Sequence, residues 1–412
     1  MSSPSKSSPS SDVESESSTI VYDHEPFVTF RSRVLAIAIT SIWPGSTPNT
    51  IVIERMRGGG FNRIIGLTQH HPGAQPDANT RYILRTPRFD AAQVHSEVAV
   101  LQFLHQHTKI PAPEVVTYDE THQNALGYPF AVQIRIPGTD LHSSFPKLRH
   151  NERCSVAREL GDIYRQMLAV RSSVAGKLAL SNDHKRLGVP LCVAPLRLMD
   201  AESLTPYSDS PATESVHELL TANFQAQKAR RLERFPTDFV TPEFMDKFCQ
   251  MTSELDAGGW LASTHYSIAH LDLAPRNILV NPTQGEKVPI ISGVLDWDNA
   301  VLAPMFMSCA PPMWIWAWQD DDEEDERCAN DRPPTSEGRE LKLLFEEAAG
   351  HDYVRFAYES AYRLARRLVR FAIDGIPSSE DFEEAETMLQ EWEDIYQARK
   401  DGIEARNSSR DN

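Results

Sequence analysis

Residues 270–280 read HLDLAPRNILV and residues 293–300 read GVLDWDNA, so two nearby segments carry a carboxylate, an amide and a second carboxylate. A phosphoryl-transfer enzyme needs one acidic group near the attacking hydroxyl and oxygen ligands for the Mg²⁺ that accompanies the nucleotide. Asp272 can accept the proton, and the side-chain oxygens of Asn277 and Asp296 can face the metal. The residue types therefore indicate phosphoryl transfer.

The chain between these groups is predicted to form a β-hairpin. Residues 278–280 are a short apolar strand, residues 281–287 a turn with Pro and Gly, and residues 288–295 a returning apolar strand. Because a hairpin brings its two ends together, Asn277 would lie beside Asp296. Each polar residue taken alone is common in any loop, and only the set indicates a site.

Length and charge bound the class of protein. The chain has 412 residues, of which 41% are hydrophobic, which is enough to fill the core of two domains or of one bilobal unit. A formal net charge of −17 disfavours a nucleic-acid binder, because such proteins need a basic surface to neutralise phosphates. Cationic or neutral small partners fit this charge better.

The cysteines argue against a zinc site or a disulfide scaffold. The chain has five, an odd number, and none of them shows CxxC or CxxxC spacing: Cys154, Cys192, Cys249, Cys309 and Cys328. We therefore expect reduced cysteines and a cytoplasmic location.

Neither the Ser-rich segment at residues 1–19 nor the apolar stretch at residues 301–318 predicts a membrane anchor. Residues 1–19 are Ser-rich without the apolar core of a secretory signal, and we interpret them as a disordered tail. Residues 301–318 are apolar but contain Pro304, Pro311 and Pro312, which makes a membrane span improbable.

A glycine turn joins two predicted strands in the amino-terminal part. Residues 50–56 and 64–68 are the strands, and Gly58, Gly59 and Gly60 allow the loop to approach phosphates closely. The turn lacks the Lys-Ser/Thr of a Walker loop and does not open a helix as a Rossmann loop does. An ordinary hairpin turn is the alternative.

The two segments quoted first resemble the aminoglycoside phosphotransferase/choline kinase family, and most closely its fungal branch. The resemblance implies an α+β, protein-kinase-like bilobal fold with a small β-rich N-lobe and a larger, mainly α C-lobe. It implies Asp272 as the catalytic base and Asn277 and Asp296 as Mg²⁺ ligands. The family usually has Gly or Arg after the His, where this chain has Leu271, and its members phosphorylate many hydroxyl compounds.

Within that family, a basic residue on the third strand touches the nucleotide phosphates and pairs with a helix Glu. Residues 81–86 are the third predicted strand, so these places fall to Arg85 and Glu97, with the glycine turn also in contact with the nucleotide. The predicted helix has apolar residues on one face: Val94, Val98, Leu101 and Leu104. The family often has Lys rather than Arg, and an ordinary surface salt bridge is the alternative.

Residues 128–138 form a last apolar strand that ends in Pro-Gly and resembles the hinge between two kinase lobes. The resemblance implies that adenine binds main-chain groups of Gln133, Ile134 and Arg135. A plain inter-strand loop is the alternative.

The carboxy-terminal part has helical spacing, at Val156, Leu160, Ile163 and Met167 and again at Ala357, Ala361, Leu364, Leu368 and Ala372. Residues 186–211 have weak periodicity and precede a helical run, residues 214–235. We interpret them as an insertion that shapes the acceptor pocket.

Trp314, Trp316 and Trp318 alternate with smaller apolar residues after the metal-binding segment. They could hold an organic cation, but core packing is favoured. The acidic run at residues 320–326 is interpreted as a solvated loop.

These observations predict a disordered tail (1–19), an N-lobe that binds nucleotide (20–136), a catalytic and acceptor-binding C-lobe (137–400) and a polar tail (401–412). The predicted function is ATP- and Mg²⁺-dependent transfer of the γ-phosphate to a hydroxyl of a small molecule, with Mg-ATP between the lobes. A catalytically weak or inactive, kinase-like nucleotide-binding scaffold is one alternative. A protein kinase is another, disfavoured because no Ala-Pro-Glu segment follows Asp296. Acceptor identity, ATP versus GTP and oligomeric state do not follow from the sequence.

Overall fold

The computed structural model describes most of the chain, namely residues 27–56, 62–71, 73, 79–88, 92–181, 191–196, 204–282, 288–318 and 325–408. The predictions for the tail at residues 1–19, for Gly58, Gly59 and Gly60, and for most of the acidic run lie outside these residues. The chain divides into two compact units, which are described separately: unit 1 is Met1–Val98 with Pro113–Arg135, and unit 2 is Ala99–Ala112 with Ile136–Asn412.

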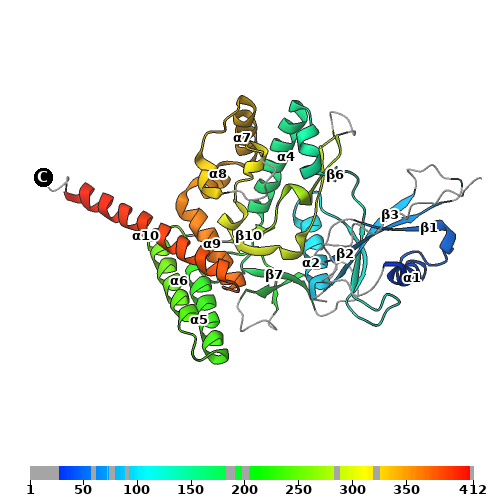
Figure 1. Cartoon of the computed structure of the whole chain (residues 1–412), viewed down its shortest axis with the longest axis horizontal. Coiled ribbons are helices and arrows are strands. Elements are labelled where there is room, and N and C mark those ends of the chain that lie inside the picture. Colours follow the sequence, from blue (N-terminus) through cyan, green and yellow to red (C-terminus); the bar gives the residue numbers. More distant parts are fainter. Residues whose placement is uncertain are drawn as a thin grey trace, which may run out of the picture. The chain divides into compact units, whose positions relative to one another are not determined.

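Unit 1 contains a five-stranded antiparallel sheet in the order β1-β2-β3-β5-β4 (Figure 1). Its strands are β1 (Ile51–Arg55), β2 (Asn62–Gln69), β3 (Thr80–Pro87), β4 (Val115–Asp119) and β5 (Phe130–Ile134). The strands predicted at residues 50–56, 64–68 and 81–86 are confirmed. β-Branched and aliphatic residues supply them, as expected for a half-buried pleated surface.

Helix α1 (Phe27–Ile37) covers the core of this sheet. Phe30 and Val34 of α1 pack with Ile65, Leu84 and Val132, which are fully or almost fully buried. Helix α2 (Ala92–His107) follows β3, and the four apolar residues of its predicted face are all buried. This packing fixes β3 and the first half of α2, which carry Arg85 and Glu97.

Unit 2 is mainly helical. Its longer helices are α4 (His150–Ala169), α5 (Val216–Arg234), α6 (Val240–Ala257), α7 (Ser336–Ala349), α8 (His351–Tyr358), α9 (Ser360–Asp374) and α10 (Ser379–Ser408). Helices α4 and α7 lie side by side, and α5 packs along α6 (Figure 1). The apolar positions predicted on α4 are all buried, because Val156, Leu160, Ile163 and Met167 recur at helical spacing.

Two small antiparallel sheets complete unit 2. One has the order β10-β13-β7-β8-β9, built from β10 (Tyr266–Ala269), β13 (Val301–Pro304), β7 (Gly176–Leu180), β8 (Leu191–Pro195) and β9 (Thr205–Pro206). The other has the order β12-β11-β6, built from β12 (Ile291–Val294), β11 (Ile278–Val280) and β6 (Thr139–Asp140). The second sheet holds the predicted hairpin.

The predicted fold class, α+β with a strand-rich part and a larger helical part, is confirmed. Two details differ. The spacing from Ala357 to Ala372 predicts one helix, but α8 ends at Tyr358 and α9 begins at Ser360, with Glu359 in an extended conformation. Residues 186–211 contain β8 and β9, because Leu191 and Val193 pair with the preceding strand β7 and the following strand β9, which local periodicity does not reveal.

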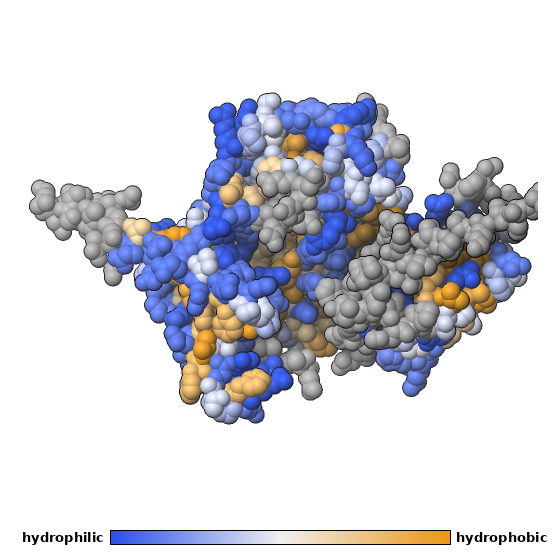
Figure 2. Space-filling model, viewed as in Figure 1, coloured by the Kyte–Doolittle hydropathy of each residue, from blue (hydrophilic) through white to orange (hydrophobic). Residues whose placement is uncertain are grey.

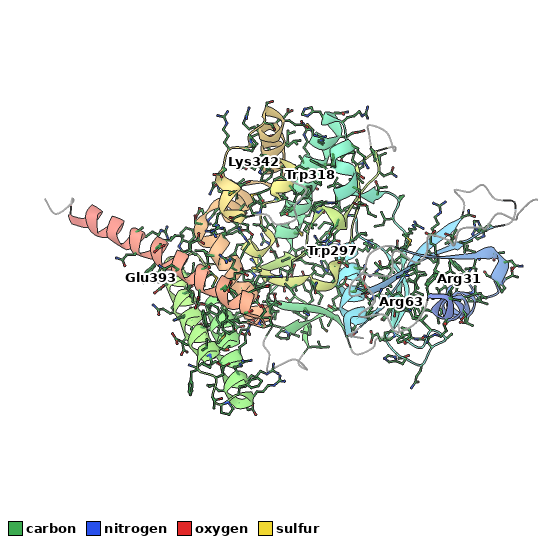
Figure 3. The ribbon with its side chains drawn as sticks, viewed as in Figure 1. Arg31, Arg63, Trp297, Trp318, Lys342 and Glu393 are labelled. Carbon is green, nitrogen blue, oxygen red and sulfur yellow. The ribbon has the colours of Figure 1, made fainter. Side chains whose placement is uncertain are left out.

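The tryptophan cluster contributes to the core, as favoured from the sequence. Trp314 and Trp316 are buried, and Trp318 stacks on Phe145 with ring centroids 5.1 Å apart. Figure 3 labels Trp318 and, on α7, Lys342, whose ammonium group lies over the Trp316 ring at 5.5 Å. Among the described residues, no helix is long and apolar enough to cross a lipid bilayer.

Candidate active site

The loop at residues 270–277 begins where β10 ends and leads through a short 3-10 turn, Pro275–Asn277, into β11. Strand β11 pairs with β12, and the Leu295 N–H donates to the Asn277 carbonyl at 2.7 Å. The predicted hairpin is therefore confirmed. It places the end of this loop next to the backbone that leads into Asp296.

His270 braces the loop. Its Nε2 donates to the Leu295 carbonyl at 2.8 Å, and its Nδ1 accepts the Asp272 N–H at 3.3 Å. The ring packs on Trp297, which Figure 3 labels in the interior, at a centroid distance of 4.5 Å. Burial lowers the pKa of His270, although its hydrogen bond to Leu295 and the nearby carboxylates of Asp272, Asp296 and Asp298 oppose this shift. A neutral, doubly hydrogen-bonded imidazole is suited to a structural role.

The Asp272 carboxylate is held from two sides. Arg276 donates to Oδ1 at 2.6 Å, and the Asn277 amide donates to Oδ2 at 3.1 Å and to the Asp272 carbonyl at 2.9 Å. The Asp272 side chain keeps about a third of its surface exposed, and Arg276 about half. The carboxylate is therefore accessible to a small molecule from solution. The sequence reasoning missed Arg276, although an opposite charge four residues after Asp272 was a visible signal.

Two residues of the site have a left-handed backbone. Leu271 has φ 64° and Asp296 has φ 65°, and these are the only non-glycine residues with positive φ in the described chain. Such a conformation costs an L-residue with a Cβ about 1–2 kcal/mol, less for Asp than for Leu. A Gly at position 271, which the resembling family often has, would adopt it without that cost. Strain of this kind concentrates at functional sites.

Unit 1 brings Arg85 and Glu97 together. The Arg85 Nε lies 2.8 Å from the Glu97 Oε1, and the Gln133 amide donates to the same oxygen at 2.7 Å. The side chains of the pair are only 8% and 6% exposed, so it is not a surface salt bridge. Gln133, predicted to bind adenine through its backbone, uses its side chain to hold Glu97.

The other predicted hinge residues have much of their backbone engaged in unit 1. The Ile134 N–H donates to the Glu114 carbonyl at 2.8 Å, and the Arg135 N–H donates to the Arg81 carbonyl at 3.1 Å. The Arg135 guanidinium forms an ion pair with Glu54. Contacts of Ile134 or Arg135 with adenine would therefore use their carbonyl oxygens.

A cavity of about 460 Å³ opens beside the 270–277 loop, within unit 2. Its apolar wall includes Leu271, Leu273 and Met307. Its charged wall carries three arginines of α9 and four acidic residues: Arg366, Arg367, Arg370, Glu326, Asp374, Asp381 and Glu384. The sequence reasoning missed this cavity, although arginines among the apolar positions of α9 were a visible signal.

The charges of the cavity are largely paired with one another. Arg366 is buried and donates to Glu326 at 2.6 Å, and Arg367 donates to Glu384 at 2.9 Å. Arg370 lies 3.6 Å from Asp374 and is about half exposed. The wall is thus polar and close to charge balance.

Three features together are typical of a kinase-like phosphotransferase fold. They are the α+β architecture, a buried Arg on a strand that pairs with a Glu on the next helix, and an H-x-D-x4-N loop that precedes a hairpin. Residues 74–341, about two thirds of the chain, match the sequence profile of APH, the phosphotransferase enzyme family. The chain belongs to this family, as the resemblance implied.

Two relatives found by sequence similarity come from the fungus Aspergillus fumigatus. The chain is 24% identical over 318 residues to a subtelomeric hrmA-associated cluster protein of Aspergillus fumigatus strain Af293, covering 63% of this chain and 60% of that protein. The corresponding protein of strain CEA10 gives the same values. The chain thus spans about 60% of the length of these relatives.

Solved structures of similar fold include ADP-bound aminoglycoside phosphotransferase APH(2'')-Ib, at 11% identity and a TM-score of 0.49, covering 87% of this chain and 96% of that one. Another is a thermostable mutant of aminoglycoside phosphotransferase APH(4)-Ia in ternary complex with ADP and hygromycin B, at 14% identity and a TM-score of 0.48, covering 88% and 98%.

Proposed function

We propose that this protein transfers the γ-phosphate of ATP, with Mg²⁺, to a hydroxyl group of a small molecule. The observation that carries the proposal is the Asp272 carboxylate, held in one orientation by Arg276 and Asn277 yet partly exposed. A general base needs both properties, because it must be positioned and must also reach the acceptor hydroxyl. Membership of the phosphotransferase enzyme family supports the reaction class.

The chemistry of the donor atoms fits Mg²⁺. Asn277 uses its amide nitrogen for Asp272, which leaves its oxygen as the group that can bind a cation. Asp296 offers a carboxylate two residues after the end of β12, the strand that pairs with β11. Mg²⁺ prefers such oxygen ligands, and when bound it neutralises charge on the phosphates. Asn277 and Asp296 would hold it.

Asp272 would orient the acceptor hydroxyl for in-line attack and take up its proton. Arg276 and Asn277 keep the carboxylate in place, while His270 fixes the backbone through Leu295. Positioning of this kind contributes much of the rate enhancement in phosphoryl transfer.

Arg85 would contact the nucleotide phosphates, with Glu97 and Gln133 fixing its position within unit 1. Arg presents a planar fork that can bind phosphate through two hydrogen bonds. The proposed phosphate contacts also include the glycine turn, which lies outside the described residues: Gly58, Gly59 and Gly60. Adenine would contact main-chain groups of the predicted hinge, namely Gln133, Ile134 and Arg135.

The cavity beside the 270–277 loop would bind the acceptor. Its near balance of arginine and acidic side chains fits a polar or zwitterionic acceptor. The five cysteines are all free thiols, which supports the proposal of a cytoplasmic location.

An ADP-release assay with Mg-ATP tests the function over aminoglycosides, amino alcohols, sugars and hydroxylated metabolites. We expect acceptor-dependent turnover that needs Mg²⁺ and collapses in Asp272→Asn, while calorimetry shows unchanged Mg-ATP binding in that variant. Tight Mg-ATP binding without turnover for any acceptor would favour a nucleotide-binding scaffold instead.

A further inference from the structure

A cluster of three different metal-ligating side chains lies where helices α4 and α7 pack together. His150 and Cys154 are one turn apart on the same face of α4, and Glu340 faces them from α7. The ligand atoms of the three residues all lie within 4.8 Å of one another. Hydrophilic residues dominate the visible surface over these helices (Figure 2).

Two of the three distances within the cluster are close to those around a tetrahedral zinc ion, and the third is somewhat longer. The His150 Nε2 lies 3.6 Å from the Cys154 Sγ and 3.3 Å from the Glu340 Oε2, and the Glu340 Oε1 lies 4.0 Å from that sulfur. Usual zinc bond lengths to sulfur, nitrogen and oxygen place such ligand atoms about 3.4–3.6 Å apart. One ion can therefore contact all three after a small movement of Glu340.

We propose that His150, Cys154 and Glu340 bind Zn²⁺ with three protein ligands and one solvent position. Thiolate and imidazole donors favour Zn²⁺ over the oxygen-preferring Mg²⁺ and Ca²⁺. A cavity of about 720 Å³ lined by all three residues gives an ion access to the cluster. The ion would join α4 to α7.

The surroundings of His150 favour the same conclusion. Glu337 Oε1 lies 3.4 Å from the His150 Nδ1, and Arg153 donates to that carboxylate at 3.0 Å. Zinc-bound histidines usually donate their second ring N–H to a carboxylate, which fixes the tautomer and leaves the other nitrogen for the metal. Glu337 is placed to do this, with the Nε2 directed to Cys154 and Glu340.

The thiol of Cys154 must lose its proton before it can bind zinc. The residue is only 6% exposed, and burial together with the Glu340 carboxylate raises the pKa of its thiol. Zinc binding would release this proton to solvent as the Zn–S bond forms. The sequence alone disfavoured zinc because it offered no paired cysteines. Glu340 joins the set only through the packing of α7 on α4.

This proposal is independent of the proposed function. The cavity at this cluster and the one beside the 270–277 loop share no lining residue. A failure to find any acceptor would leave the zinc proposal intact, and the reverse also holds.

The test is Co²⁺ titration of the full chain, free of any histidine tag and pretreated with a chelator. We expect one equivalent to give the sulfur-to-cobalt charge-transfer band of a thiolate ligand, and Zn²⁺ to abolish it. Cys154→Ser should lose the band, whereas Cys328→Ser, which alters an exposed cysteine outside the cluster, should keep it. A band that persists in Cys154→Ser, or is absent in the parent chain, would overturn the proposal.

A second experiment leaves the buried Cys154 unchanged. It measures the Zn²⁺ affinity of other variants by competition with a chromophoric chelator. His150 and Glu340 are about half exposed, so His150→Gln and Glu340→Gln should fold normally. Both should weaken Zn²⁺ binding more than Glu337→Gln, which should cost about tenfold. Equal affinity in the parent and in all three variants would mean adventitious binding and overturn the assignment.

Discussion

Two arginine–carboxylate pairs in this molecule have similar geometry and opposite surroundings. Arg85 and Glu97 lie 2.8 Å apart with side chains 8% and 6% exposed, whereas Arg276 and Asp272 lie 2.6 Å apart with 53% and 35% exposed. A buried charge that loses its partner cannot be solvated, but an exposed one can. The first pair therefore costs much to separate, and the second costs little to open.

The largest effect is expected at the exposed pair, on catalysis. Asp272→Asn keeps the shape of the side chain but removes the proposed base, so turnover should fall by about 10²–10⁴. Steady-state ADP release with an acceptor found in the screen measures it. Near-normal turnover would remove Asp272 from the role of base.

Breaking the buried pair should instead reduce stability. Glu97→Ala leaves the Arg85 guanidinium without its buried partner, which typically costs about 3–5 kcal/mol. Urea unfolding measures the loss. Asp162→Ala, which breaks the exposed pair with Arg165, is the matched control and should change stability by less than about 1 kcal/mol. Equal losses in the two variants would show that burial does not distinguish the pairs.

Backbone strain next to Asp272 gives a smaller effect of opposite sign. Leu271 adopts φ 64°, so the free energy of unfolding of Leu271→Gly should exceed that of Leu271→Ala by about 1 kcal/mol. Urea unfolding of the two variants measures this difference. Both variants remove the leucine side chain, and only glycine relieves the strain. If alanine proves as stable as glycine, the left-handed conformation at this position carries no cost.

The smallest effect is expected from Arg276→Ala. The exposed pair contributes about 0–1 kcal/mol, so the free energy of unfolding should hardly change. Turnover should fall by less than in Asp272→Asn, because Asn277 still holds the carboxylate. Should Arg276→Ala match Asp272→Asn, Arg276 itself would contact the reacting groups.

Local pattern predicted the parts of the fold that depend on neighbours in sequence. The hairpin of β11 and β12 follows from two apolar runs around a turn, and α4 follows from the spacing of Val156, Leu160, Ile163 and Met167. Arg85 and Glu97 were paired correctly because the resemblance assigned them to a strand and to the next helix.

Other features depend on tertiary contacts that spacing does not encode. The helical spacing continues across Glu359, so the end of α8 could not be predicted. Strand β8 forms because β7 lies beside it, and the proposed acceptor cavity forms because α9 faces the 270–277 loop. Leu271 has a left-handed backbone between His270 and Asp272, which are hydrogen-bonded to each other, and a leucine side chain does not favour that conformation.

Strand β6 pairs with β11 through Asp140 and Leu279, so a loop of about 140 residues must close before the two strands can meet. During synthesis, β6 leaves the ribosome long before its partner exists. The three-stranded sheet is therefore a late event in folding. The loop that carries Asp272 leads directly into β11, so it takes its final shape only after most of the chain has been made. An incomplete chain that ends before Ile278 would lack β11, so its 270–277 loop would have no hairpin to hold it.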